Sequence, residues 1–166
     1  MTDLAFLSLG AADAIGRFRP LARSPMARRL RDAGAELEER DGWLVAVRVP
    51  SEEERPLKIR DVTHERARPS NTLLLAGTPA EGKESDAGYA ALELEGPGAT
   101  TLLRRLTELP LDDLPAVGAL AHVRAWIVRK GDEHYRLFFE QEYGHYLWEV
   151  VVDAAEPLGG GPAGTP

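Results

Sequence analysis

The sequence contains no cysteine. This absence excludes disulfide bonds, thiolate-bound zinc, iron–sulfur clusters and a cysteine nucleophile. A chain without disulfides suits a reducing compartment, so we expect a cytoplasmic protein.

Basic residues are scarce relative to acidic ones. The 166 residues include 20 Lys and Arg against 27 Asp and Glu, which gives a formal net charge of −7 at pH 7. We therefore expect neither nucleic acid nor a membrane as partner, because both attract positive charge. No stretch approaches the length of about 18 apolar residues that a spanning helix needs, and the first residues lack a basic start followed by an apolar run. These observations predict a soluble protein that is not exported.

The length of the chain allows it to bury a core of its own. Composition divides it into a mixed N-terminal segment, a patterned central part and a tail rich in Gly and Pro. The expected parts are an N-terminal arm (1–23), one α+β domain (24–155) with halves at 24–77 and 89–155, their connecting loop (78–88) and a disordered tail (156–166).

The first half begins with the pattern of a short amphipathic helix and a β-hairpin. In "RSPMARRLRDAG", Ser24 is suited to the N-cap, Pro25 to the first helical position and Gly34 to the left-handed residue after the last turn. In "AELEERDGWLVAVRV", Asp41 and Gly42 fit a tight hairpin turn. Two more short strands are expected at 57–63 and 71–77.

The second half alternates strands and helices. In "YAALELEG" leucine alternates with glutamate at the two-residue period of a half-buried strand. Apolar residues at helical spacing follow, which predicts a helix that starts with Pro97 and stops at Pro110. The order strand, helix, strand, strand, helix predicts a ferredoxin-like split βαβ unit in an antiparallel sheet with helices on one face, whose final strand comes from the first half. The remaining elements are a long strand at 119–129, a strand at 134–141 and a helix at 143–155.

The Gly96-Pro97-Gly98 turn raises the question of a phosphate site. A dinucleotide-binding fingerprint needs three glycines at G-x-G-x-x-G spacing, and a P-loop needs a lysine; "GPGATT" has neither. We interpret the turn as a connection between strand and helix, and we expect the chain by itself to bind neither FAD nor NAD.

Other reactive side chains are scattered along the sequence. None of the four histidines has another at metal-ligand spacing, so we expect no metal site. Asp61 and His64 in "RDVTHE" offer an acid–base pair, and the alternative interpretation is a strand edge followed by a turn. Asp112 and Asp113 lie on a Pro-flanked stretch, where surface or capping roles are expected. We expect no catalytic residue in this chain.

About half of the aromatic residues gather near the C-terminal end. Phe138 and Phe139 are adjacent on a predicted strand and must face opposite sides, so both sides of that strand need a cover. The chain's own helices can cover one side, whereas the other is either covered internally or forms a partner surface. We predict partner contacts at Phe138, Tyr143 and Tyr146, and we place Trp148 in the core.

The order and spacing of three stretches resemble the gamma subunit of heterotetrameric sarcosine oxidase. The stretches are "SPMARRLRDAGAELEERDGWLVAVRV", "LELEGPGATTLLRRLTELPLDDLPAVGALAHVRAWIVR" and "YRLFFEQEYGHYLWEVVVDAA". That subunit belongs to the wider superfamily of folate-binding glycine-cleavage T-proteins, or aminomethyltransferases. The matching elements span about 24–155: Ser24-Pro25, Gly96-Pro97, Leu111-Asp112, the strand with Ala121 to Trp126, and the aromatic end from Tyr143 to Trp148.

The resemblance implies an accessory subunit with no active site of its own. In such oxidases, large alpha and beta subunits oxidise an N-methyl amine and pass the one-carbon unit to tetrahydrofolate. FAD, FMN, NAD and tetrahydrofolate are therefore expected on these flavin-bearing partners, and none of them on this chain alone.

The resemblance to the T-protein is partial. T-proteins are much longer and build their pterin cavity from repeated halves, of which this chain has material for about one. "DVTH" at 61–64 is similar to an Asp-Val-Ser-His stretch of T-proteins, but a loop separates it from the strand before Gly96, so no folate-contacting residue is carried over. The alternatives are a stand-alone tetrahydrofolate-binding protein or small one-carbon transferase, and a scaffold without any link to folate.

Overall fold

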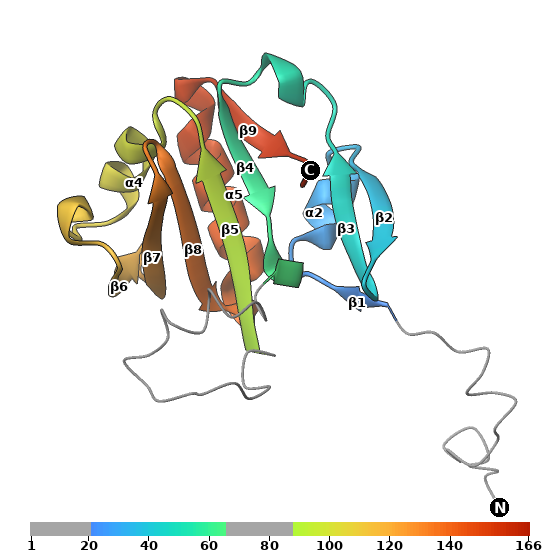
Figure 1. Ribbon diagram of the computed structural model, residues 1–166, viewed down its shortest axis with the longest axis horizontal. Coiled ribbons are helices and arrows are strands. Elements are labelled where there is room, and N and C mark those ends of the chain that lie inside the picture. The colour runs from blue at the N-terminus through green and yellow to red at the C-terminus, as the bar shows by residue number, and fades with distance from the viewer. Residues whose placement is uncertain (1–20, 66–87) are drawn as a thin grey trace, which may run out of the picture.

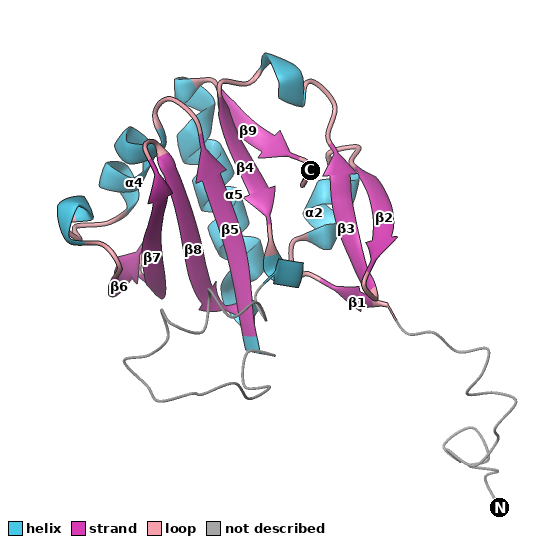
Figure 2. Cartoon of the chain, viewed as in Figure 1, coloured by secondary structure: helices cyan, strands magenta, loops and turns pink. Residues whose placement is uncertain are grey.

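A computed structural model describes residues 21–65 and 88–166 (Figure 1). This part of the chain forms a small and a large β-sheet with three α-helices (Figure 2). The predicted strand at 71–77 and nearly all of the predicted arm and connecting loop lie outside the described residues. Of the helices in the described part, none has the length and apolar character that a membrane crossing requires.

Three strands form the small sheet. β2 (Glu36–Arg40) and β3 (Trp43–Arg48) make the predicted hairpin, and β1 (Ala22–Arg23) runs parallel to β3 on its other side. Asp41 and Gly42 connect the hairpin with φ angles of 50° and 79°. Positive φ at both central residues is what a type I′ turn requires, so the prediction from the Asp-Gly pair is confirmed.

The helix α2 (Ala27–Asp32) starts later than the sequence predicts. Met26, and not Ser24, occupies the N-cap position. The Ser24 hydroxyl accepts a hydrogen bond from the Met26 N–H at 3.0 Å and closes a turn that precedes the helix. Gly34 has a φ of 81°, as predicted for the residue that follows the last turn.

Six strands form the large sheet in the order β6-β7-β8-β5-β4-β9, and only β4 and β9 are parallel neighbours. The antiparallel β8 separates β5 from β7, which is the predicted split βαβ arrangement. β4, from the first half, takes the place of the final strand of a ferredoxin-like unit, and β9 adds a strand beyond it. The bounds are β4 Leu57–Asp61, β5 Tyr89–Glu95, β6 Ala116–Leu120, β7 Val123–Gly131, β8 His134–Glu140 and β9 Gly160–Ala163.

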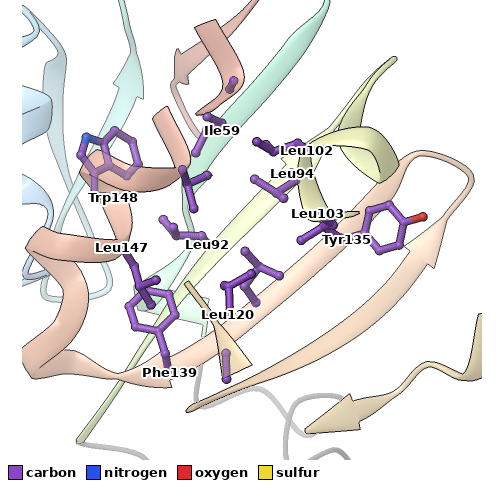
Figure 3. Close-up of a cluster of buried hydrophobic side chains, with 14 of the residues drawn as sticks. Ile59, Leu92, Leu94, Leu102, Leu103, Leu120, Tyr135, Phe139, Leu147 and Trp148 are labelled. Atoms are coloured by element: carbon purple, nitrogen blue, oxygen red, sulfur yellow. The ribbon is translucent and has the colours of Figure 1, made fainter. Parts of the chain in front are cut away.

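Two helices, α4 (Ala99–Leu106) and α5 (Gly144–Ala155), cover one face of the large sheet (Figure 1). Leucines of both helices meet side chains of β4, β5, β7 and β8 in the main core (Figure 3). Trp148 is only 4% exposed and belongs to this core, as predicted. The α+β fold with largely antiparallel sheets and helices on one face is therefore confirmed. Short 3₁₀ helices lie at Glu52–Glu54, Thr63–Glu65, Leu111–Asp113, Gln141–Tyr143 and Glu156–Leu158.

The predicted long strand at 119–129 is wrong. The structure divides it into the end of β6 and most of β7, joined at Ala121 and His122 with φ angles of 45° and 69°. Neither residue is the Gly or Asn that usually marks such a turn, so the sequence carries no visible sign of it.

The predicted bounds of α4 are also wrong. The helix begins at Ala99 after Gly98, whose φ is 94°, and Pro97 stays outside it. It ends at Leu106, because Thr107 is extended and its hydroxyl donates a hydrogen bond to the carbonyl of Ala119 at 2.7 Å. This side-chain bond replaces the last helical turn with a contact to β6.

The tail at 156–166 is not disordered, contrary to the prediction. It forms a 3₁₀ helix and β9, and the Thr165 N–H then donates to the carbonyl of Ala46 at 2.7 Å, which links the large sheet to the small one. A Cβ at Gly164 would lie only 2.2 Å from the carbonyl oxygen of Val47. The tail therefore needs glycine for close packing, although a run of glycines more often indicates disorder.

Candidate functional site

A side-chain carboxylate of this chain, that of Glu133, occupies the N-terminus of α4. Glu133, in the turn between β7 and β8, accepts a hydrogen bond from the Thr100 N–H at 2.9 Å and interacts with the N–H groups of Gly98 and Ala99. Burial acts to raise the pKa of Glu133, but these hydrogen bonds together hold it below its usual value. The carboxylate takes the place of an anion at the helix N-terminus. The turn before α4 therefore does not fit the phosphates of a dinucleotide.

Asp61 lies buried at the end of β4 within a local hydrogen-bond network. Its Oδ1 accepts from the N–H of Thr63 at 3.1 Å and from the Thr63 hydroxyl at 2.7 Å. Burial raises the pKa of Asp61, although the hydrogen bonds from Ser24 and Thr63 oppose that shift. His64 Nε2 lies 3.9 Å from Glu65 Oε1. The charge of His64 also acts to lower the pKa of Asp61, so the two side chains interact, while the hydrogen bonds from Thr63 close a turn at the end of β4.

Charged side chains form an array on the sheet face opposite the helices. Arg60, Glu93 and Arg136 are neighbours across β4, β5 and β8. Arg136 is 7% exposed; its Nε donates to Glu93 Oε2 at 2.8 Å, and a second guanidinium nitrogen lies 3.0 Å from Glu65 Oε2. His134 Nε2 lies 3.0 Å from Glu93 Oε1. Arg60 pairs with Glu95 instead, so each cation of the array has a carboxylate partner and the array is suited to holding strands together.

The pKa of Glu93 reflects these pairs. Burial acts to raise it, but the hydrogen bond and charge of Arg136, with a further contribution from His134, together hold the pKa below its usual value. Glu93 is therefore ionised at neutral pH and keeps its ion pair with Arg136.

The histidines are distributed over separate elements. Across residues 21–65 and 88–166, no group of three or more His, Asp or Glu side chains is placed to hold a metal ion. Asp112 and Asp113, in the 3₁₀ helix after α4, are both exposed.

The three aromatic residues predicted to contact a partner do not form one surface. Phe138 and Phe139 face opposite sides of β8, as expected, but Phe138 is only 3% exposed. Tyr143 and Tyr146, at the start of α5, are 39% and 43% exposed. The structure thus leaves the two tyrosines open to a partner and places Phe138 in a buried cluster. The other members of that cluster are Val62, Ala91 and Val128, with the partly buried Trp126 against them.

Tyr146 lines a groove that sequence reasoning missed. The groove has a volume of about 810 Å³ and lies between the end of α4, the β6–β7 turn and α5. Arg104, Arg105 and His122 are charged or titratable groups along it, and the Tyr146 hydroxyl donates to the carbonyl of Ala121 at 3.1 Å. The pair of arginines at the end of the predicted helix was the visible signal, but the turn at Ala121 that completes the groove was not predicted.

Comparison with known proteins links the chain to two kinds of protein. No family model matches the sequence. It is 33% identical over 96 residues to an aminomethyltransferase from Streptomyces coelicolor, a match that covers 54% of this chain and 26% of that protein. An aminomethyltransferase from Porphyromonas gingivalis is 30% identical over 83 residues, or 45% of this chain and 23% of the relative. The chain thus spans about a quarter of the length of these relatives.

A solved structure matches the fold over nearly its whole chain. It is a chain of the heterotetrameric sarcosine oxidase from Corynebacterium sp. U-96 in complex with pyrrole 2-carboxylate, with a TM-score of 0.53 and 17% identity. The match covers 83% of this chain and 96% of that one. At this identity the likeness concerns the fold, and it confirms the resemblance found in the sequence at that level.

Proposed function

We propose that this chain is an accessory subunit of a sarcosine oxidase-like heteromeric amine oxidase. The complex would couple oxidative N-demethylation to one-carbon transfer onto tetrahydrofolate, with FAD, FMN, NAD and the folate bound by its large alpha and beta subunits in the cytoplasm. One observation carries the proposal: the fold covers 96% of a chain from a heterotetrameric sarcosine oxidase. The fold match extends over nearly all of that chain, whereas this chain spans only about a quarter of an aminomethyltransferase.

The polar groups of the chain support a non-catalytic role. Glu133 occupies the N-terminus of α4, Asp61 bonds to Thr63, and Arg136 pairs with Glu93 and Glu65. Each of these charged groups is engaged in holding the fold. Exposed tyrosines and an open groove are features of a surface that meets another protein.

Co-expression with candidate large flavoprotein subunits from the same organism tests the proposal. A tag on this chain should recover both large subunits together with their flavin absorbance, whereas the chain purified alone should be colourless. The proposal is wrong if the large subunits assemble and oxidise the amine in the absence of this chain and do not bind it when it is added.

The second candidate is a stand-alone tetrahydrofolate-binding protein or an aminomethyltransferase-like one-carbon carrier. The 33% identity to an aminomethyltransferase over 96 residues favours it. Titration calorimetry of the isolated chain with tetrahydrofolate separates the two candidates. An accessory subunit should bind weakly or not at all, and micromolar or tighter binding would support the second candidate.

A further inference from the structure

We propose that the groove beside α4 receives an acidic segment of a large partner subunit. This inference rests on the proposed function, because it assumes that the chain works within a complex, and it identifies the surface and the chemistry of the contact. The groove is built from the end of α4, the β6–β7 turn and the exposed side of α5.

The charge of the groove is opposite to that of the chain. The chain has a net charge of −7, yet Arg104, Arg105 and His122 line the groove against a single carboxylate, Glu108. Neither arginine forms an ion pair with a described residue, whereas Arg136, on the sheet face opposite the helices, pairs with two carboxylates. Both arginines are exposed in the last turn of α4, so their guanidinium groups can reach a carboxylate from outside.

The walls of the groove are fixed before any partner arrives. The Ala121 N–H donates to the carbonyl of Leu106 at 2.7 Å, and the Thr107 hydroxyl donates to the carbonyl of Ala119 at 2.7 Å. These bonds tie the β6–β7 turn to the end of α4. Ala121 also keeps a positive φ angle, which is unfavourable for a residue with a side chain and tends to be retained where the surrounding structure requires it.

Tyr146 provides an aromatic contact at the edge of the groove. Its side chain is exposed, but its hydroxyl is held by the carbonyl of Ala121. A ring fixed in this way loses little conformational entropy when a partner covers it. Leu109 and Val150 add apolar surface beside it. Fixed aromatic groups with arginines nearby are the residue types that contribute most to protein interfaces, and the arginines select an acidic partner.

Charge reversal tests the inference on the assembled complex. The double variant Arg104→Glu/Arg105→Glu should weaken binding to the purified large subunits by about tenfold or more, and raising the salt concentration should weaken wild-type binding much more than variant binding. Arg28→Glu/Arg31→Glu is the matched control, since it makes the same charge change on the exposed side of α2 and should alter the Kd by less than about twofold. Thermal unfolding of each isolated variant checks that it is folded.

The outcomes separate the inference from the proposed function. If wild-type protein does not bind the large subunits, both are wrong. If wild-type protein binds and both double variants bind as tightly as wild type, the complex exists but the groove is not the contact. An equal loss in the two variants would also overturn the inference, because it would indicate a general effect of charge.

A single cysteine can identify the segment that fills the groove, because the chain has none of its own. Glu108→Cys, labelled with a benzophenone maleimide, should crosslink to an Asp- and Glu-rich segment of a large subunit, and Arg28→Cys should not. Crosslinking to a neutral or basic segment, or to a second copy of this chain, would overturn the inference.

Discussion

The two faces of the large sheet are buried in different ways. On the face toward α4 and α5, alternate residues of β8 are Tyr135, Leu137 and Phe139, and all three belong to the main core. On the opposite face the intervening residues include Arg136 and Phe138, which are also buried. The first face is held by apolar contacts and by a hydrogen bond of 2.7 Å between the hydroxyls of Tyr135 and Thr100, whereas the second combines a small apolar cluster with paired charges. The same strand can therefore satisfy two environments because its side chains alternate.

Removing a large ring from the helix-covered face should have the largest effect on stability. Phe139 is fully buried, so Phe139→Ala leaves a cavity that α5 and β5 cannot fill. The free energy of unfolding should fall by about 3–5 kcal/mol. Chemical denaturation measures the loss, and a change below about 1 kcal/mol would mean that this face is loosely packed.

Breaking the charge pair on the opposite face should cost somewhat less. Arg136→Met removes the guanidinium that pairs with Glu93 and Glu65, which should lower the free energy of unfolding by about 2–4 kcal/mol. The double variant Arg136→Met/Glu93→Gln should be more stable than Arg136→Met, because it also removes the Glu93 charge that has lost its arginine partner. If the two changes simply add, Arg136 and Glu93 do not stabilise one another.

Lowering the pH should weaken the charge pairs of the second face, with a smaller effect on the free energy of unfolding than the two substitutions above. The pKa of Glu93 is lower in the folded chain than its usual value of 4.5, so Glu93 contributes stability above that value and loses it as pH falls through its folded pKa. The difference in unfolding free energy between wild type and Glu93→Gln should therefore shrink as pH falls below 4.5. Phe139→Ala is the control, since its destabilisation should stay constant. A constant difference for Glu93→Gln would contradict the pairing.

Replacing the exposed tyrosines near the start of α5 should have the smallest effect on stability. Tyr143→Ala and Tyr146→Ala remove exposed rings and should each change the unfolding free energy by less than about 1 kcal/mol. Co-purification with the large subunits should nevertheless be weakened. Wild-type association together with a large loss of stability would instead assign these rings to the fold.

The sequence predicted the elements whose pattern is local. The Asp41-Gly42 hairpin, the leucine alternation in β5 and the core position of Trp148 are all confirmed. Each of them depends on neighbours along the chain, through turn geometry or through the period of apolar residues.

The predictions failed where a distant contact decides the structure. Ala121 and His122 form a turn without a turn residue, and the tail becomes a strand because Gly164 can approach Val47 closely. Glu133 reaches the N-terminus of α4 from a turn that lies 33 residues later than Thr100. No local pattern reveals these contacts. The groove was missed for the same reason, although Tyr146, predicted as a partner contact, is exposed and lines it.

Native mass spectrometry of material purified through a tag on this chain tests the central claim most directly. An accessory subunit should appear in one particle with both flavin-bearing subunits, in a fixed ratio that persists after dilution. Recovery of the chain alone from cells that also produce both large subunits would contradict the account.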